Sequence, residues 1–229
     1  MKKIGVIGGL GPLATVDFFK KVVDLTGAKS DQENIPILIY NNPQIPDRTQ
    51  AILYGGISPV DDIIKTGKVL EQMGADFLCL PCNTSFYFYE EIQKSLGVQL
   101  LNMIDLTVDF IKENAIKKLC VLGTEGTIKS GIYTDKLDEE KIYYYKVDTK
   151  MEEYLTRVIY DIVKKNDFPD DVSFFIDELD RIIKEEKVDA FILGCTELPI
   201  FFKRYNLRYN CIDPTLILAQ KAVDLAKKG

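Results

Sequence analysis

The chain has 229 residues, of which 46% are hydrophobic and 28% are charged, and its formal net charge is -6. A chain of this length buries enough apolar surface for one large core or two small ones without a disulfide or metal, and interspersed lysines and acids argue against a nucleic-acid partner. The sequence contains no histidine, so any proton transfer must use Cys, Asp, Glu, Lys or Tyr.

The beginning of the sequence and its cysteines indicate where the protein works. Met1 and two lysines precede a short apolar run that ends in glycines, without the long apolar segment and cleavage site of a signal peptide. No stretch is long enough to span a membrane. Five scattered cysteines, an odd number, favour free thiols in a reducing compartment. We therefore expect a cytoplasmic protein whose partner is a small molecule.

Short apolar runs bounded by Gly, Pro or Asn alternate with stretches of helical period along the chain. This alternation is typical of an α/β fold with a mostly parallel sheet. The predicted strands are 3–7, 37–41, 77–80 and 99–103 in the first half, then 119–122, 142–147, 190–193 and 209–212 in the second. Helices are predicted between them, for example over 59–73 and 174–186.

The two halves of the chain share landmarks in the same order. Residues 2–8 resemble 117–123, residues 82–84 resemble 195–197, and residues 104–107 resemble 212–215. One such match arises by chance in any α/β protein, but several in order indicate a duplication. We therefore predict two similar lobes related by a pseudo-two-fold axis, each a mostly parallel four-stranded sheet flanked by helices.

The predicted first lobe comprises residues 1–112 together with 213–229, and the second comprises 113–212. In open parallel sheets, ligands bind outside the carboxyl ends of the strands, where helix N-termini supply N–H groups and a positive dipole. We therefore expect the site in the cleft between the lobes.

Each half places one cysteine directly after an apolar strand, Cys82 in the first and Cys195 in the second. Polar residues follow both, as expected at a strand end rather than in a core. A thiol at a helix N-terminus has a lowered pKa, and two thiols across a cleft suit inversion of a stereocentre, which needs a base on one face of Cα and an acid on the other. Cys79, Cys120 and Cys211 fall inside predicted strands and are expected to be small buried hydrophobes.

Three loops are candidates for binding a carboxylate. The glycine-rich segment 8–12 could present backbone N–H groups to an anion, although a tight turn explains it equally well, and it lacks the glycine spacing of a dinucleotide site. Its counterpart 123–130 offers hydroxyl groups. Arg48 could bind a carboxylate with two parallel hydrogen bonds, or could simply lie at the surface. Two thiols fall short of the usual zinc ligand set, so no metal is expected.

These motifs resemble those of the cofactor-independent aspartate/glutamate racemase superfamily, in particular its aspartate racemase branch. The resemblance covers nearly the whole chain and rests on segments 8–15, 45–49, 81–84, 123–133 and 193–198. It implies a two-lobed homodimeric enzyme that needs neither pyridoxal phosphate nor metal and uses Cys82 and Cys195 as its two bases. The substrate-binding residues that it implies are Gly11, Arg48, Asn83, Thr84, Thr124, Thr127, Lys164, Thr196 and Glu197.

The resemblance further implies a dicarboxylic amino acid as substrate, either aspartate, which we expect, or glutamate. Arg48 and Lys164 would meet its side-chain carboxylate and an α-carboxylate oxygen. Glu197 agrees with the aspartate branch, because glutamate racemases resemble one another in having histidine there. Phe86 stands where the family usually has histidine. Two alternatives therefore stay open: a related cysteine-dependent isomerase or decarboxylase of a small carboxylic acid, and a ligand-binding relative without turnover.

Overall fold

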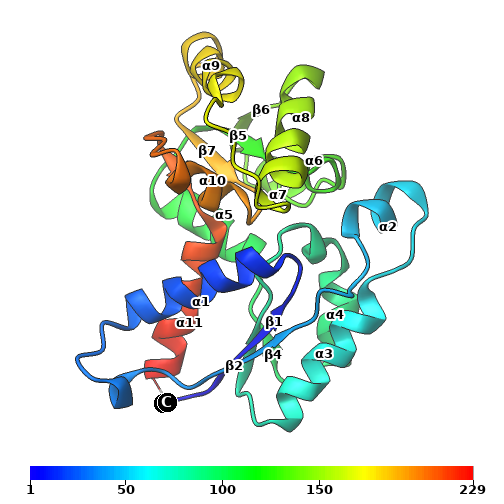
Figure 1. Ribbon diagram of the computed structural model, residues 1–229, viewed down its shortest axis with the longest axis vertical. Coiled ribbons are helices and arrows are strands. Elements are labelled where there is room, and N and C mark those ends of the chain that lie inside the picture. Colours follow the sequence, from blue (N-terminus) through cyan, green and yellow to red (C-terminus); the bar gives the residue numbers. More distant parts are fainter. Residues whose placement is uncertain (229) are drawn as a thin grey trace.

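The structure is a computed structural model that describes residues 1–228. Its strands form two four-stranded sheets in which every pairing is parallel. Figure 1 shows each sheet in a lobe of its own, the first below and the second above, with helices around both. The predicted α/β fold with two lobes is therefore confirmed.

The helices and strands of the first lobe are β1 (Ile4–Gly8), α1 (Pro12–Thr26), β2 (Ile37–Asn41), α2 (Arg48–Tyr54), α3 (Val60–Gln72), β3 (Phe77–Cys79), α4 (Tyr89–Ser95), β4 (Gln99–Leu100), α5 (Met103–Glu113) and α11 (Pro214–Lys227). Those of the second lobe are β5 (Lys118–Leu122), α6 (Glu125–Lys129), α7 (Thr134–Glu139), β6 (Tyr143–Tyr145), α8 (Thr149–Thr156), α9 (Ser173–Arg181), β7 (Ala190–Leu193), α10 (Leu198–Arg204) and β8 (Cys211–Ile212). Short 3₁₀ turns cover Asp31–Glu33 and Thr84–Phe88, and π-helical turns extend α8 over Arg157–Val163 and α9 over Ile182–Glu186.

The two sheets have the same strand order, β2-β1-β3-β4 in the first and β6-β5-β7-β8 in the second. All eight predicted strands are present. The central strands β1, β3 and β7 are buried along their whole length, as expected where helices cover both faces of a parallel sheet. Cys79 and Cys120 are fully buried in strands, as predicted, whereas Cys211 is only half-buried.

Three predicted strands, 99–103, 142–147 and 209–212, are each more than one residue longer than the strand in the structure. The strand predicted over 99–103 stops at Leu100, because the side chain of Asn102 accepts hydrogen bonds from the first turn of α5. The strand predicted over 142–147 ends at Tyr145, and Asp148 then caps α8 by accepting from the N–H of Met151. The strand predicted over 209–212 is reduced to its last two residues, and Asp213 then caps α11. Asn and Asp are strong N-cap residues, so each helix begins where such a side chain is available.

The last helix returns to the first lobe, where α11 packs against α1 and α5. The backbone N–H of Lys2 donates to the carbonyl of Ala226 at 3.0 Å, and Lys21 on α1 forms an ion pair of 2.7 Å with Asp213. We accordingly propose residues 1–112 with 213–229 and residues 113–212 as the two lobes; Gly229 lies outside the described residues. Between residues 1 and 228, no helix has the length and apolar character needed to cross a membrane.

The turn after β1 requires glycine, because Gly9 has a φ of 99° and a Cβ at this position would lie 2.3 Å from the backbone of Asn42. We expect Gly9→Ala to lower the free energy of unfolding by about 3 kcal/mol, since left-handed strain adds to overpacking. Gly27 has a φ of 62° with nothing within 4 Å of such a Cβ, so Gly27→Ala should cost only about 1 kcal/mol. Urea unfolding measures both; equal losses would contradict the role of the Asn42 contact.

Candidate active site

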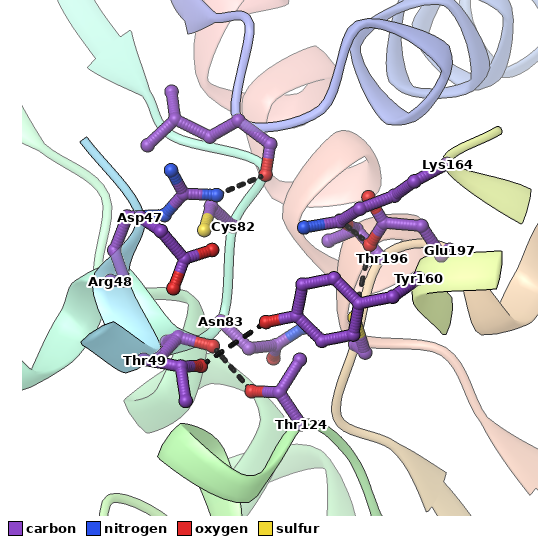
Figure 2. A pocket seen from close by; sticks show the side chains of 13 residues that line it. Asp47, Arg48, Thr49, Cys82, Asn83, Thr124, Tyr160, Lys164, Thr196 and Glu197 are labelled. Atoms are coloured by element: carbon purple, nitrogen blue, oxygen red, sulfur yellow. Dashed lines mark hydrogen bonds between the residues drawn. The ribbon is translucent and has the colours of Figure 1, made fainter. Parts of the chain in front are cut away.

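A small cavity lies where the carboxyl ends of both sheets meet. It is lined by Leu10, Asp47, Arg48, Thr49, Cys82, Asn83, Thr84, Thr124, Tyr160, Lys164, Cys195, Thr196 and Glu197. Nearly all of these residues follow strands β1, β2, β3, β5 or β7, and Figure 2 shows their side chains converging from the two lobes. The cavity has a volume of about 10 Å³, room for about one water molecule.

Most of the expected site residues line this cavity. Gly11 and Thr127 do not: Gly11 borders an adjoining cavity and Thr127 lies behind Thr84. Four further wall residues were not among the expected site residues, namely Leu10, Asp47, Thr49 and Tyr160. Leu10, Asp47 and Thr49 are chain neighbours of the expected Gly11 and Arg48, and Tyr160 lies four residues before Lys164, so proximity in the sequence was the available signal.

Arg48 is a buried residue, so the surface alternative is wrong. It begins α2, where Asp47 caps the helix by accepting from the N–H of Gln50 at 2.9 Å. Its Nη1 donates to the carbonyl of Pro46 at 2.9 Å and its Nη2 to that of Leu10 at 3.0 Å. Backbone carbonyls therefore hold both terminal nitrogens of the guanidinium, while its buried Nε has no hydrogen-bond partner.

Cys82 lies beside this guanidinium, as Figure 2 shows. Burial alone would lower the pKa of Arg48, but the neighbouring Cys82 and Asp47 outweigh this effect and raise it. The cation is therefore retained inside the protein, next to the Cys82 sulfur.

Cys195 has different surroundings. Its Sγ donates to Oε2 of Glu197 at 2.9 Å, and the Thr196 hydroxyl donates to the same oxygen at 3.2 Å. Burial, and then the negative charge of Glu197, raise the pKa of Cys195 well above its ordinary value, although Lys164 acts in the opposite direction. The predicted lowering of the thiol pKa at a helix N-terminus is therefore wrong for Cys195, because desolvation and a neighbouring carboxylate prevail.

Lys164 supplies the second cation of the cavity. Burial would lower its pKa, but Glu197 and Cys195 raise it, and its Nζ lies 4.4 Å from the centre of the Tyr160 ring. Lys164 directly follows the π-helical turn of 157–163. Such turns are frequent at functional sites, and the four buried residues of this one face the core of the second lobe.

Three threonine hydroxyls join the lobes at the base of the cavity. Thr84 of the first lobe lies 2.7 Å from Thr127 and 3.1 Å from Thr124, both of the second lobe. Thr124 also caps α6 by accepting from the N–H of Thr127 at 3.2 Å. A second link is the Tyr160 hydroxyl, which donates to Thr49 on α2 at 3.4 Å. The hydroxyls on the wall are thus oriented by contacts across the cleft.

Phe86 does not reach the cavity. Its side chain is buried and its ring stacks on Tyr89, with centroids 5.9 Å apart. The residue that replaces the histidine of the family pattern therefore packs behind the loop of Cys82 rather than on the wall of the site.

A larger cavity of about 370 Å³ adjoins the site and shares Leu10, Asp47, Arg48, Lys164 and Glu197 with it. Gly11 lies on its wall, where a Cβ would come within 2.9 Å of Oε1 of Glu197. Within residues 1–228, no three His, Cys, Asp or Glu side chains are grouped so that they could hold a metal ion.

Comparison with known proteins assigns the family. The family described as Asp/Glu/Hydantoin racemase matches residues 7–222. The chain belongs to this racemase family. The resemblance inferred from the sequence motifs, and the expectation of an enzyme of the racemase class, are therefore confirmed.

Individual members of the racemase family are similar over almost their whole length. The broad specificity amino-acid racemase RacX of Bacillus subtilis is 31% identical over 224 residues, which are 96% of each chain. The aspartate racemase of Picrophilus torridus is 35% identical with a TM-score of 0.85, over 99% of this chain and 95% of that one. An aspartate racemase homologue from Pyrococcus horikoshii is 25% identical with a TM-score of 0.78, over 99% and 100%.

The contact between Cys195 and Glu197 predicts how this thiol reacts. Glu197→Gln removes the negative charge without shortening the side chain, so the pKa of Cys195 should fall toward its ordinary value. We expect iodoacetamide to alkylate Cys195 faster in this variant across the range of about pH 7 to 9, because the thiolate is the nucleophile. Mass spectrometry of the Cys195 peptide measures the rate.

The matched control is Glu125→Gln, because Glu125 contacts Tyr54 and Lys129 but not Cys195. It should leave the alkylation rate of Cys195 at the wild-type value. Equal rates in the wild type and in Glu197→Gln would contradict the assigned effect of the carboxylate.

Proposed function

We propose that the protein racemises a dicarboxylic amino acid, aspartate in the first place and glutamate in the second, with Cys82 and Cys195 as the two proton-transfer groups and without pyridoxal phosphate. One observation carries the proposal: two thiols from corresponding positions of two similar lobes line the same small cavity. Inversion at Cα needs a proton acceptor on one face and a donor on the other.

The two thiols have different neighbours. The Arg48 guanidinium lies beside Cys82, whereas Cys195 donates to Glu197, and burial together with that carboxylate raises the pKa of Cys195. In one direction, the Cys82 thiolate takes the Cα proton and the Cys195 thiol delivers its own proton to the opposite face. Turnover then leaves Cys82 protonated and Cys195 as a thiolate. The reverse direction starts from this second state: the Cys195 thiolate takes the Cα proton, and the Cys82 thiol delivers its own proton to the opposite face.

Removal of the Cα proton places negative charge on the α-carboxylate. Asn83 is buried on the cavity wall with its Nδ2 free of any hydrogen-bond partner, and the Thr84 hydroxyl lies beside it. Fixed donors that point at developing charge in a site without water are the strongest contribution to catalysis of this kind. These two residues are therefore suited to bind the α-carboxylate and its enediolate form.

The two cations explain the preference for a second carboxylate. Lys164 and Arg48 stand on the wall shared by the site and the adjoining cavity, so a side-chain carboxylate that extends in this direction meets both. Lys164 has rotatable N–H donors, and Arg48 retains its free Nε. The cavity of about 10 Å³ is smaller than an amino acid, so the lobes must separate for substrate to enter from the adjoining cavity.

Deuterium exchange tests the two-cysteine mechanism. With the reduced protein and L- or D-aspartate in deuterated water, proton NMR should show loss of the Cα signal while chiral chromatography shows the other enantiomer. Cys82→Ala and Cys195→Ala should each lower interconversion by about a thousandfold or more, because each removes one proton-transfer group. Cys211→Ala is the control, since this thiol lies on β8 outside the cavity.

An active Cys82→Ala or Cys195→Ala variant would contradict the mechanism. Consumption of substrate without the other enantiomer would instead favour the related decarboxylase or isomerase, and binding without exchange would favour an inactive relative. The homodimer implied by the family resemblance stays a prediction, to be measured by sedimentation.

The substrate class is tested at Lys164. Lys164→Gln should lower kcat/KM for aspartate about tenfold to hundredfold, because a hydrogen bond to a charged group is lost. Its neighbour Lys165 forms an exposed ion pair with Asp161, so Lys165→Gln should leave kcat/KM unchanged. Steady-state racemisation assays measure both variants, and an unaltered KM and kcat in Lys164→Gln would exclude Lys164 from substrate binding.

A further inference from the structure

Tyr133 is a fully buried tyrosine that lies between the two cysteine loops without lining the cavity of the site. It precedes α7 in the second lobe, and its side chain packs in an apolar cluster that contains residues of both lobes, such as Met103 of the first and Val121 of the second. It is among the largest side chains that the fold buries completely. A polar hydroxyl at such a position needs a partner, because burial without one is costly.

The partner is Asn83, the residue after Cys82. The Tyr133 hydroxyl donates to Oδ1 of Asn83 at 2.5 Å, across the interface between the lobes. Burial raises the pKa of Tyr133, so the phenol keeps the proton that it donates. The ring of the same tyrosine packs beside Gly194, the residue before Cys195, where a Cβ would lie 3.4 Å from Cε2. One side chain therefore contacts the chain neighbours of both thiols.

The hydrogen bond from Tyr133 determines which end of the Asn83 amide has no hydrogen-bond partner. An amide group has an acceptor end and a donor end of nearly the same shape. Because the Tyr133 hydroxyl takes the oxygen, the Nδ2 end remains buried and without a partner. An unpartnered donor in a residue that is only 2% exposed, on the wall of the cavity, points to a ligand that accepts hydrogen bonds.

We propose that Tyr133 is a positioning residue, which fixes the Asn83 amide with its donor end toward the α-carboxylate of the substrate. The proposal rests on the racemase function proposed above. If the hydroxyl were absent, the amide could rotate and direct its oxygen at the carboxylate, where two acceptors repel. The neighbouring Thr84 needs no such help, because Thr124 and Thr127 already orient its hydroxyl.

The first test is Tyr133→Phe, which removes the hydroxyl and keeps the ring beside Gly194. We expect kcat/KM for aspartate to fall about tenfold to hundredfold, with most of the loss in kcat, because the amide meets the greatest charge in the transition state. The matched control is Tyr205→Phe, which removes a hydroxyl that donates to the carbonyl of Pro169 at 2.6 Å in the second lobe, away from the site. It should leave kcat and KM unchanged.

A double-mutant cycle separates positioning from general packing. In the Asn83→Ala background there is no amide to orient, so adding Tyr133→Phe should change kcat/KM by less than about twofold. Fully additive losses from the two substitutions would overturn the proposal, as would wild-type kinetics for Tyr133→Phe alone.

Side-chain amide NMR provides a readout that does not depend on turnover. The Asn83 amide signals of ¹⁵N-labelled protein, assigned by their loss in Asn83→Ala, should be sharp in the wild type and shifted or broadened in Tyr133→Phe. If this change occurs in a protein that racemises no amino acid, the proposed function fails while the orienting contact stands. If the signals are identical in both proteins, the orienting role is overturned.

Discussion

Burial of charged and polar side chains is the constraint that organises this molecule. A buried charge must be paired or neutralised, and the small cavity is lined by two cations, two carboxylates and two thiols. Arg48 donates to backbone carbonyls, Glu197 accepts from Cys195 and Thr196, and Asp47 accepts from the first turn of α2. The network of threonines completes the pairing across the lobes.

The duplicated architecture provides symmetry of position but not of charge. Both sheets place a thiol after the third strand in chain order, since Cys82 follows β3 and Cys195 follows β7. A guanidinium accompanies the first thiol and a carboxylate the second. In the proposed mechanism, the two similar lobes bring their thiols to opposite faces of the substrate, and the carboxylate beside Cys195 raises the pKa of that thiol. The tight turn at Gly9 lies beside the cavity residue Leu10, and the π-helical turn directly precedes the cavity residue Lys164.

The fold was predictable from the sequence to a large extent, because parallel strands covered on both faces are continuous apolar runs. Strand ends were less predictable, since helix caps such as Asn102 compete with strand pairing for the same residues. The cleft residues were found mostly from motifs. What the sequence did not reveal are properties of three-dimensional neighbours: the raised pKa of Cys195, the carbonyls that hold Arg48, and the contact between Tyr133 and Asn83. Each depends on residues distant in the chain or on burial, which no local pattern encodes.

The return of α11 to the first lobe has a mechanical consequence. The chain passes between the lobes twice, once between α5 and β5 and once between β8 and α11, and Figure 1 shows α5 and α11 close together at this junction. Two bodies joined at two points retain essentially one degree of freedom, rotation about the line through those points. A singly tethered pair would have to search over several translations and rotations on every cycle. In the lobe separation proposed above, the two crossings limit the paths of closure, and the hydroxyl contacts across the cleft return the two sulfur atoms to the same alignment.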